Sequence, residues 1–284
     1  MATYRQWRAL WIMQRVDGVD RQNASALAVR DEGDQMAEYE LVYGPMLLGR
    51  GEFPRLILEY AAADYVDLAR VPEASGGGID HVMAIREGRQ SDWPAYAPPV
   101  LRHRGQTLSQ TAVICAYLGE TFQLDGGAAA KWKTQSAMLS ILDCVDEVHD
   151  THHPISVADY YEDQKPEALK RTRAFVDSRL PLRLKYLERL SGYAAGPWLL
   201  GAELTYADLG LFQLSEGLTF SFPSAMGVYR DRYPAVMRIA RTVSELPTIA
   251  AYLQSPRRIP FNEHGVFRQY PELDLMPSGS NSGD

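Results

Sequence analysis

The sequence has few cysteines, no long apolar run and no excess of basic residues. The two cysteines among 284 residues, Cys115 and Cys144, both fall inside helical apolar patterns, so neither a disulfide framework nor a zinc knuckle is supported. No segment approaches the roughly 18 consecutive apolar residues that a membrane helix needs. The net charge of -7 and the pI near 5.4 argue against a nucleic-acid partner, which needs a clustered basic face. The sequence therefore predicts a globular cytoplasmic protein, with no membrane span and no nucleic acid bound.

The pattern of apolar residues divides the chain into two parts, as its length also favours. From Tyr39, YELVY is typical of a short strand, and the apolar residues after Gly51 recur at helical spacing. A second strand at 66–69, a short helix, the strands VLRH and QTL, and a further helix complete the order βαβαββα. After GGAAA the strand signals stop. The sequence predicts an α/β domain over 39–125 and an all-helical domain over 130–275, with a flexible tail at 276–284.

Two helices of the second part carry clear signals. Met138, Ile141, Leu142 and Val145 form one buried stripe, and Thr205 with Asp208 three residues later predicts a capped helix start. The stripe from Leu169 to Leu187 predicts another helix, with a kink at Pro181.

Residues 1–38 differ from the rest, with arginines, tryptophans and no acid before Asp17. Two interpretations stay open. The segment is an amphipathic transit peptide, which would direct the protein to an organelle, or it is a flexible extension, with Met36 as the natural start. We favour the extension, because MAEYELVYGP begins where the first strand begins.

Two segments place ligand-binding chemistry at the ends of predicted strands. Tyr43 ends the first strand and precedes the helix start GRGEFPRLILEY, where backbone N–H groups converge. Downstream, PPVLRHRGQTLSQTAVICAYLGE supplies an extended Pro-Pro segment, a turn at Gly105 and a helix entry at Gln110 and Thr111 that attracts a carboxylate. Over Tyr39 to Asp274 this arrangement resembles the cytosolic glutathione S-transferase superfamily, nearest to the tyrosine-type classes (sigma, pi, mu and alpha) and sigma-like among them.

The resemblance implies a thioredoxin-like N-terminal domain, an all-α C-terminal domain, glutathione as co-substrate, a small electrophilic or hydrophobic second substrate, and a homodimer. It assigns catalysis to Tyr43, whose phenol would donate a hydrogen bond to the glutathione thiolate, and to Arg50, which would orient and assist that site. One departure is that Gly49 and Arg50 lie one residue further from Tyr43 than is usual.

The resemblance also implies the residues that bind glutathione. A cis peptide at Pro99 would turn the backbone of Val100 outward to pair with the cysteinyl part, and the helix entry would hold the γ-glutamyl carboxylate. Trp93 would line the glycine end, and an acid on the first long helix would reach the partner subunit's glutathione amine. The glutathione residues are thus predicted as Trp93, Pro99, Val100, Gln110, Thr111 and Glu147.

The segment EVHDTHHPISVADYY contains three closely spaced histidines, His149, His152 and His153. Histidines three or four residues apart on a helix can bind a metal ion. Pro154 ends the helix at once and no Cys or Glu completes a ligand set, so the sequence predicts no metal. It favours a role in the second-substrate pocket or the domain interface and does not separate the two.

The predicted function is therefore a glutathione transferase that conjugates glutathione, as the thiolate, to electrophiles. Alternatives are a glutathione-dependent isomerase or dehalogenase that uses the same thiolate, and a non-catalytic member that binds ligands or serves as a scaffold. The presence of Tyr43, Arg50, Gln110 and Thr111 argues against a scaffold. A thiol-disulfide oxidoreductase is disfavoured, because that chemistry needs a cysteine near position 43.

Overall fold

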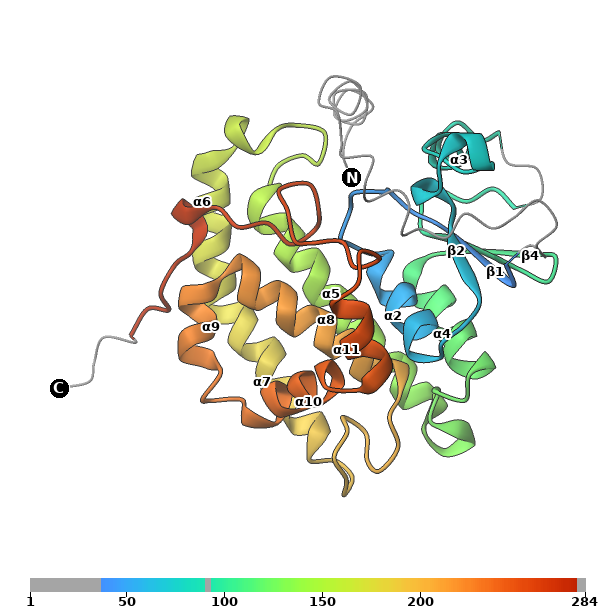
Figure 1. Cartoon of the computed structure of the whole chain (residues 1–284). Coiled ribbons are helices and arrows are strands. Elements are labelled where there is room, and N and C mark those ends of the chain that lie inside the picture. Colours follow the sequence, from blue (N-terminus) through green and yellow to red (C-terminus); the bar gives the residue numbers. More distant parts are fainter. Residues whose placement is uncertain (1–36, 90–92, 280–284) are drawn as a thin grey trace.

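The computed structural model of the chain describes residues 37–89 and 93–279, and it divides into a small sheet domain and a larger helical part (Figure 1). The sheet has four strands in the spatial order β2-β1-β3-β4, with β1 parallel to β2 and the other neighbours antiparallel. The elements of this part are β1 (Tyr39–Val42), α2 (Glu52–Tyr60), β2 (Tyr65–Asp67), α3 (Asp80–Arg86), β3 (Val100–His103), β4 (Gln106–Ser109) and α4 (Thr111–Thr121). The predicted order βαβαββα is confirmed. The second strand is shorter than expected, because the chain turns into a 3₁₀ helix at Leu68–Arg70.

The sheet is covered on both faces. Because successive side chains alternate across a strand, Leu41 joins the main core with α2 and α4, whereas Val42 joins a smaller cluster with Val82 of α3. The sheet is therefore the middle of three layers, between α3 on one face and α2 with α4 on the other. Tyr43, which follows β1, lies where this domain meets the helical part.

The helical part is built around the buried helix α8. Its elements are α5 (Gly127–His152), α6 (Lys165–Ala174), α7 (Leu180–Ser191), α8 (Tyr206–Ser221), α9 (Pro223–Tyr229), α10 (Pro234–Ser244) and α11 (Pro247–Leu253). Helix α8 is buried over most of its length, and Asp208 accepts hydrogen bonds from the N–H and hydroxyl of Thr205, which confirms the predicted cap. The predicted stripe on α5, from Met138 to Val145, is also buried.

One expectation for the helical part was wrong, and another is met in a particular form. Leu169 is exposed, so the buried face of α6 is formed by Ala168 and Thr172. The irregularity expected from Pro181 is present as a π-helical turn at Phe175–Arg179, which contains Asp177, four residues before the proline.

The chain termini bear on the predicted flexible segments. The predicted extension lies outside the described residues except for its last two, 37 and 38, and residues 280–284 of the tail also lie outside. The described part of the tail is held in place, because the N–H and hydroxyl of Ser278 both donate to the carboxylate of Asp177. That part of the predicted flexible tail is therefore attached to the helical domain.

The last segment of the chain ties the two parts together. In Figure 1 the segment after α11 runs along their junction toward α6. At its start Arg258 forms an ion pair with the fully buried Glu52 of α2, and the hydroxyl of Tyr252 donates to the same carboxylate at 2.6 Å. Glu52 also pairs with Arg55, which binds Asp67 at 2.5 Å. Burying these charges is tolerable only because each has an opposite charge beside it.

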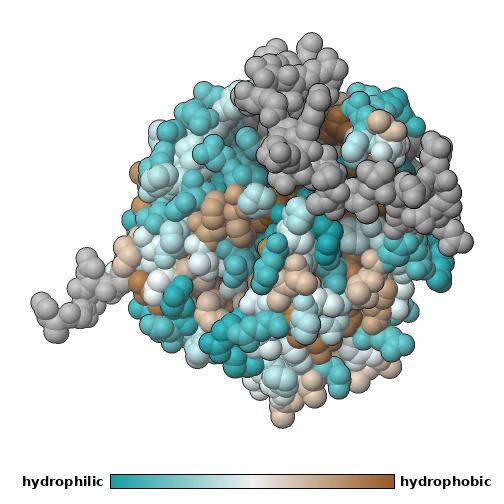
Figure 2. Space-filling model, viewed as in Figure 1, coloured by the Kyte–Doolittle hydropathy of each residue, from teal (hydrophilic) through white to brown (hydrophobic). Residues whose placement is uncertain are grey.

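Most apolar side chains lie inside the molecule. On the face shown in Figure 2, hydrophilic side chains predominate and apolar ones form small separate groups. Within the described ranges, no helix combines the length and apolarity needed to cross a bilayer.

Candidate active site

Tyr43 is enclosed by the loop that connects β1 to α2. Two glycines make this approach feasible: a Cβ on Gly49 would lie 2.7 Å from the phenol oxygen, and one on Gly51 would lie 2.4 Å from Cγ of the ring. Both distances are too short for a side chain, so the loop can enclose the phenol only with glycine at these positions. The ring is buried, with 8% of its surface exposed.

The phenol oxygen of Tyr43 accepts a hydrogen bond from the backbone N–H of Arg50 at 3.0 Å. Burial raises the pKa of Tyr43 above its ordinary value, although the Arg50 N–H acts in the opposite direction, so the phenol stays protonated at neutral pH. Among the described residues its own hydrogen has no acceptor. The group is thus a hydrogen-bond donor whose oxygen is already fixed in position.

Arg50 presents its backbone to Tyr43 and its side chain to the helical part. The guanidinium forms an ion pair with Asp146 of α5, and the backbone carbonyl accepts a 3.4 Å hydrogen bond from the hydroxyl of Thr111. Arg50 therefore connects the phenol, the start of α4 and the middle of α5.

The start of α4 lies beside this loop. Gln110 has a positive φ of 71°, which is uncommon for a residue other than glycine, and its side chain is exposed. The first helical hydrogen bond runs from Ile114 N–H to Gln110 C=O, so the preceding amides of the helix have no partner within it. Thr111 is buried against Arg50. Tyr43, Arg50, Gln110 and Thr111 thus lie in one continuous group.

The remaining predicted glutathione residues fit this group less well. A cis peptide is present between Pro98 and Pro99. Val100 lies between Val42 of β1 and Ser109 of β4, so a strand flanks it on either side. The expectation that the Val100 backbone turns outward is therefore wrong. Trp93 is 56% exposed, on the segment that leads to Pro98.

Glu147 does not have the geometry expected of it. Its carboxylate binds Arg179 at 2.7 Å and Arg183 at 2.6 Å within the same chain. Burial opposes ionisation, but the hydrogen bonds from the two arginines outweigh it and hold the pKa of Glu147 below its usual value. Within the chain, the neighbouring Asp146 is the acid that contacts Arg50 of the site, and a contact of Glu147 with the partner's glutathione stays a prediction. Sequence spacing could not separate two adjacent acids on one helix.

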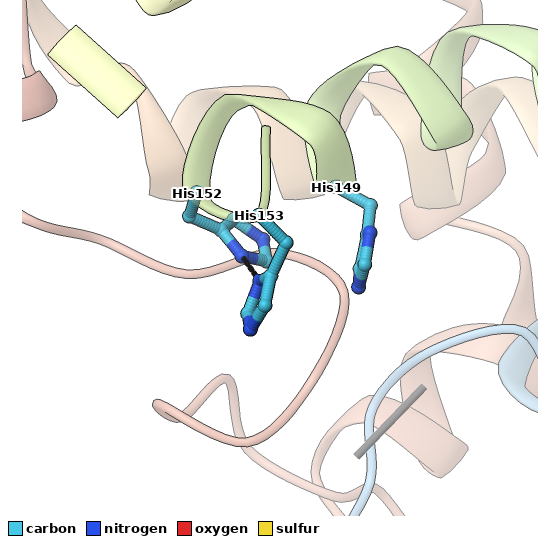
Figure 3. A group of neighbouring side chains, drawn as sticks. All are labelled: His149, His152 and His153. Atoms are coloured by element: carbon cyan, nitrogen blue, oxygen red, sulfur yellow. Dashed lines mark hydrogen bonds between the residues drawn. The ribbon is translucent and has the colours of Figure 1, made fainter. Parts of the chain in front are cut away.

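The three histidines at the end of α5 lie together, as Figure 3 shows. Their candidate ligand atoms are all within 4.8 Å of one another. His152 Nε2 donates to the backbone carbonyl of Val266 at 2.9 Å, and its Nδ1 lies 2.5 Å from His153 Nδ1. Burial lowers the pKa of His149 to about 3 and that of His153 to about 4, and it holds the pKa of His152 well below 6.5. All three rings are neutral at pH 7.

The histidines also lie near the Tyr43 loop through the C-terminal segment. A methyl group of Val266, whose carbonyl binds His152, would lie 3.4 Å from a Cβ on Gly49. No local pattern predicts this neighbour, because 114 residues separate Val266 from His152.

Comparison with known proteins agrees with this architecture. A family model described as "Glutathione S-transferase, C-terminal domain" matches residues 149–256. Glutathione S-transferase 1 of Ascaris suum is 26% identical over 237 residues, which cover 80% of this chain and 100% of the relative. Hematopoietic prostaglandin D synthase of Gallus gallus is 26% identical over 226 residues, which cover 77% of this chain and 96% of the relative.

A solved structure shows the fold directly. The structure described as "rat hPGDS complexed with a quinoline" aligns with a TM-score of 0.58 at 23% identity, over 79% of this chain and 98% of that one. The predicted fold class, a thioredoxin-like domain followed by an all-α domain, is confirmed.

Proposed function

Because the chain belongs to the cytosolic glutathione S-transferase superfamily, we propose that it binds glutathione beside Tyr43 and transfers the thiolate to an electrophilic substrate. The observation that carries this proposal is the 3.0 Å hydrogen bond from Arg50 N–H to the phenol oxygen, which leaves the phenol hydrogen to be donated. A free thiol has a pKa near 8.5, so only a few per cent is ionised at pH 7. The sigma-like class remains a prediction.

The energies involved are of matching size. Lowering a thiol pKa by about two units requires about 2.7 kcal/mol of preference for the anion. A hydrogen bond to a charged group contributes about 1.5 to 3 kcal/mol. One phenol donor, strengthened by the Arg50 N–H that polarises it, therefore supplies most of the required stabilisation.

The start of α4 suits the γ-glutamyl carboxylate of glutathione. Its first-turn amides have no partner within the helix, and the positive end of the helix dipole favours an anion there. Gln110, exposed at this end, is placed to hydrogen-bond the same group. In this arrangement the thiol lies toward Tyr43 and the electrophile approaches from the helical part.

Replacing Tyr43 by Phe tests the proposal. The ring and its packing stay, while the thiolate loses one donor, so conjugation of a general aromatic chloride near pH 6.5 should fall about ten- to a hundredfold with little change in glutathione binding. The loss should shrink as the pH rises toward the free thiol pKa, because solvent then supplies the thiolate.

The matched control is Tyr39→Phe, which removes a hydroxyl at the start of the same strand, where the ring stacks on His103 at 3.9 Å. It should conjugate at the parental rate. A Tyr43→Phe protein as active as the parent at pH 6.5 would refute the assignment of Tyr43. A parent that binds glutathione but conjugates nothing would instead favour the ligand-binding alternative.

A glutathione-dependent isomerase is the second candidate, because prostaglandin D synthases are among the relatives. The two reactions differ in thiol balance: conjugation consumes one glutathione thiol per turnover, whereas isomerisation returns it. Titrating free thiol during turnover separates them.

We further propose that the protein forms a two-fold dimer through the exposed side of α5. The proposal rests on the family and on apolar side chains left exposed there: Trp132 is 73% exposed and Leu139, seven residues later on the same face, is 45% exposed. Val113 of α4, 48% exposed, extends the apolar surface of the sheet domain.

A further inference from the structure

The histidine cluster consists of His149 and His152 from the last turn of α5 and of His153, the residue that directly follows the helix. His149, His152 and His153 stand at positions i, i+3 and i+4, so their side chains leave the helix on the same side (Figure 3). His152 and His153 are buried, with 1% and 5% exposed, while His149 is partly exposed. Burial therefore holds His152 and His153 in place, and the side of the cluster at His149 is open to an incoming ligand.

The contact of His152 with Val266 determines which of its nitrogens is available. A carbonyl oxygen only accepts hydrogen bonds, so the 2.9 Å contact requires a proton on Nε2 of His152. In the neutral ring, Nδ1 then carries a lone pair, and this is the atom that faces His153 at 2.5 Å. A histidine held by a backbone carbonyl through one nitrogen, with the other directed into a cluster, has the orientation of a metal ligand.

The spacing of the nitrogens suits a small divalent ion. Zinc–imidazole bonds of 2.0–2.1 Å in a tetrahedral site place the nitrogen atoms about 3.3 Å apart. The observed separations lie on both sides of this value, from 2.5 Å between His152 and His153 to at most 4.8 Å across the cluster. Binding would require the His149 and His153 side chains to rotate until these separations become equal. His153 can move its proton to Nε2 and so expose a lone pair on Nδ1.

We propose that His149, His152 and His153 form a binding site for a divalent transition-metal ion of the zinc or cobalt type. Imidazole is a borderline ligand that suits these ions and not Mg²⁺ or Ca²⁺, which require oxygen ligands. Three ligands leave one tetrahedral position for water or another small ligand, on the partly exposed side of His149. The site adjoins the Tyr43 group, because the charge of Arg50 acts on His149, but it shares no residue with that group. The proposal does not rest on the transferase reaction.

Nearby charges act on the site in opposite directions. The carboxyl end of α5 presents the negative end of the helix dipole, which favours a cation. Arg268 contributes a positive charge that acts on all three rings, although its Nε is engaged by the carbonyl of Gly265 at 2.9 Å, and Arg50 contributes another that acts on His149. Repulsion from these positive charges lowers the affinity of the site for a metal cation.

Metal titration of the full-length, tag-free protein tests the proposal. After chelator treatment, Zn²⁺ should bind with one ion per chain by calorimetry, and Co²⁺ should produce the strong visible absorption of a four-coordinate ion. Zn²⁺ at a hundred times its dissociation constant should raise the melting temperature by about 5 °C or more, whereas Mg²⁺ should not. His149→Gln and His153→Gln should each weaken Zn²⁺ binding by about a hundredfold or more.

The matched control is His264→Gln, a histidine on the C-terminal segment near Arg268 but outside the cluster. It should bind Zn²⁺ like the parent. His152 is left unchanged because it also holds Val266. Absence of stoichiometric binding, or binding that both cluster variants retain, would overturn the proposal and leave the histidines as a hydrogen-bonded packing group. Loss of binding in His264→Gln alone would place the ion elsewhere and would also overturn it.

Discussion

The side chain of Tyr43 has two kinds of neighbour that act at different points. Its oxygen is fixed by the N–H of Arg50, whereas its ring lies against the backbone of Gly51. The contact with Arg50 orients the phenol for the proposed hydrogen bond to the thiolate. The contact with Gly51 determines whether there is room for the phenol in this position.

Gly51→Ala should therefore displace the phenol. The φ of Gly51 is -72°, which alanine adopts easily, so any loss comes from the added Cβ, 2.4 Å from Tyr43 Cγ, and not from backbone strain. We expect a destabilisation of about 1 to 3 kcal/mol in chemical denaturation and a lower conjugation rate.

Gly227→Ala is the matched control for this change. It lies inside α9, where a Cβ would meet nothing within 4 Å, and it should be neutral or stabilise by up to about 1 kcal/mol. Equal stability and activity of the two variants would show that the loop around Tyr43 can shift to accommodate a Cβ without loss of either.

At the scale of elements, α5 carries two adjacent acids with different roles. Asp146 is 64% exposed and pairs with Arg50, whereas Glu147 is 13% exposed between Arg179 and Arg183. Exposed pairs contribute little to stability, and hydrogen bonds between half-buried charges contribute more.

Glu147→Gln should destabilise the protein by about 1 to 3 kcal/mol at pH 7, because two guanidinium groups lose their counter-charge. The folded state lowers the pKa of Glu147 below 4.5, so its contribution is present above that value and is lost as the pH falls through the lowered pKa. Urea unfolding should therefore show parent and variant converging in acid.

Asp146→Asn serves as the control on the same helix, and its unfolding free energy should stay within about 0.5 kcal/mol of the parent's. A larger effect from Asp146 than from Glu147 would contradict the roles assigned to the two acids.

The helices and strands could be predicted from periodic local patterns in the sequence. Contacts between residues far apart in the sequence could not. The βαβαββα order, the buried stripe of α5 and the cap of α8 follow from spacing and propensity within one segment. The Arg50–Asp146 pair joins residues 96 positions apart, and no local signal distinguishes Asp146 from Glu147. The Tyr43 loop was predictable from its glycines and its place after a strand.

At the scale of the whole molecule, the exposed apolar side of α5 determines the proposed assembly. The protein should sediment at micromolar concentration with twice the chain mass of 31.8 kDa. Trp132→Glu should shift it toward the monomer, because a charge at the centre of an apolar contact is costly to bury.

Leu182→Glu provides the control for this assembly. Leu182 is a similarly exposed apolar residue, 57% exposed, on α7. This variant should remain dimeric. A parent protein that sediments as a monomer would remove the dimer, and dissociation by Leu182→Glu instead of Trp132→Glu would move the interface to α7.

The buried charges of α2 also affect the order in which the chain can fold during its synthesis. Glu52 receives its hydrogen bond from Tyr252, 200 residues later, and its pairing with Arg258 comes later still. A nascent chain that has emerged only through the sheet domain holds Glu52 beside Arg55 but without its two later partners, Tyr252 and Arg258. The first domain therefore reaches its full stability only after residues 252–258 have left the ribosome and packed against α2.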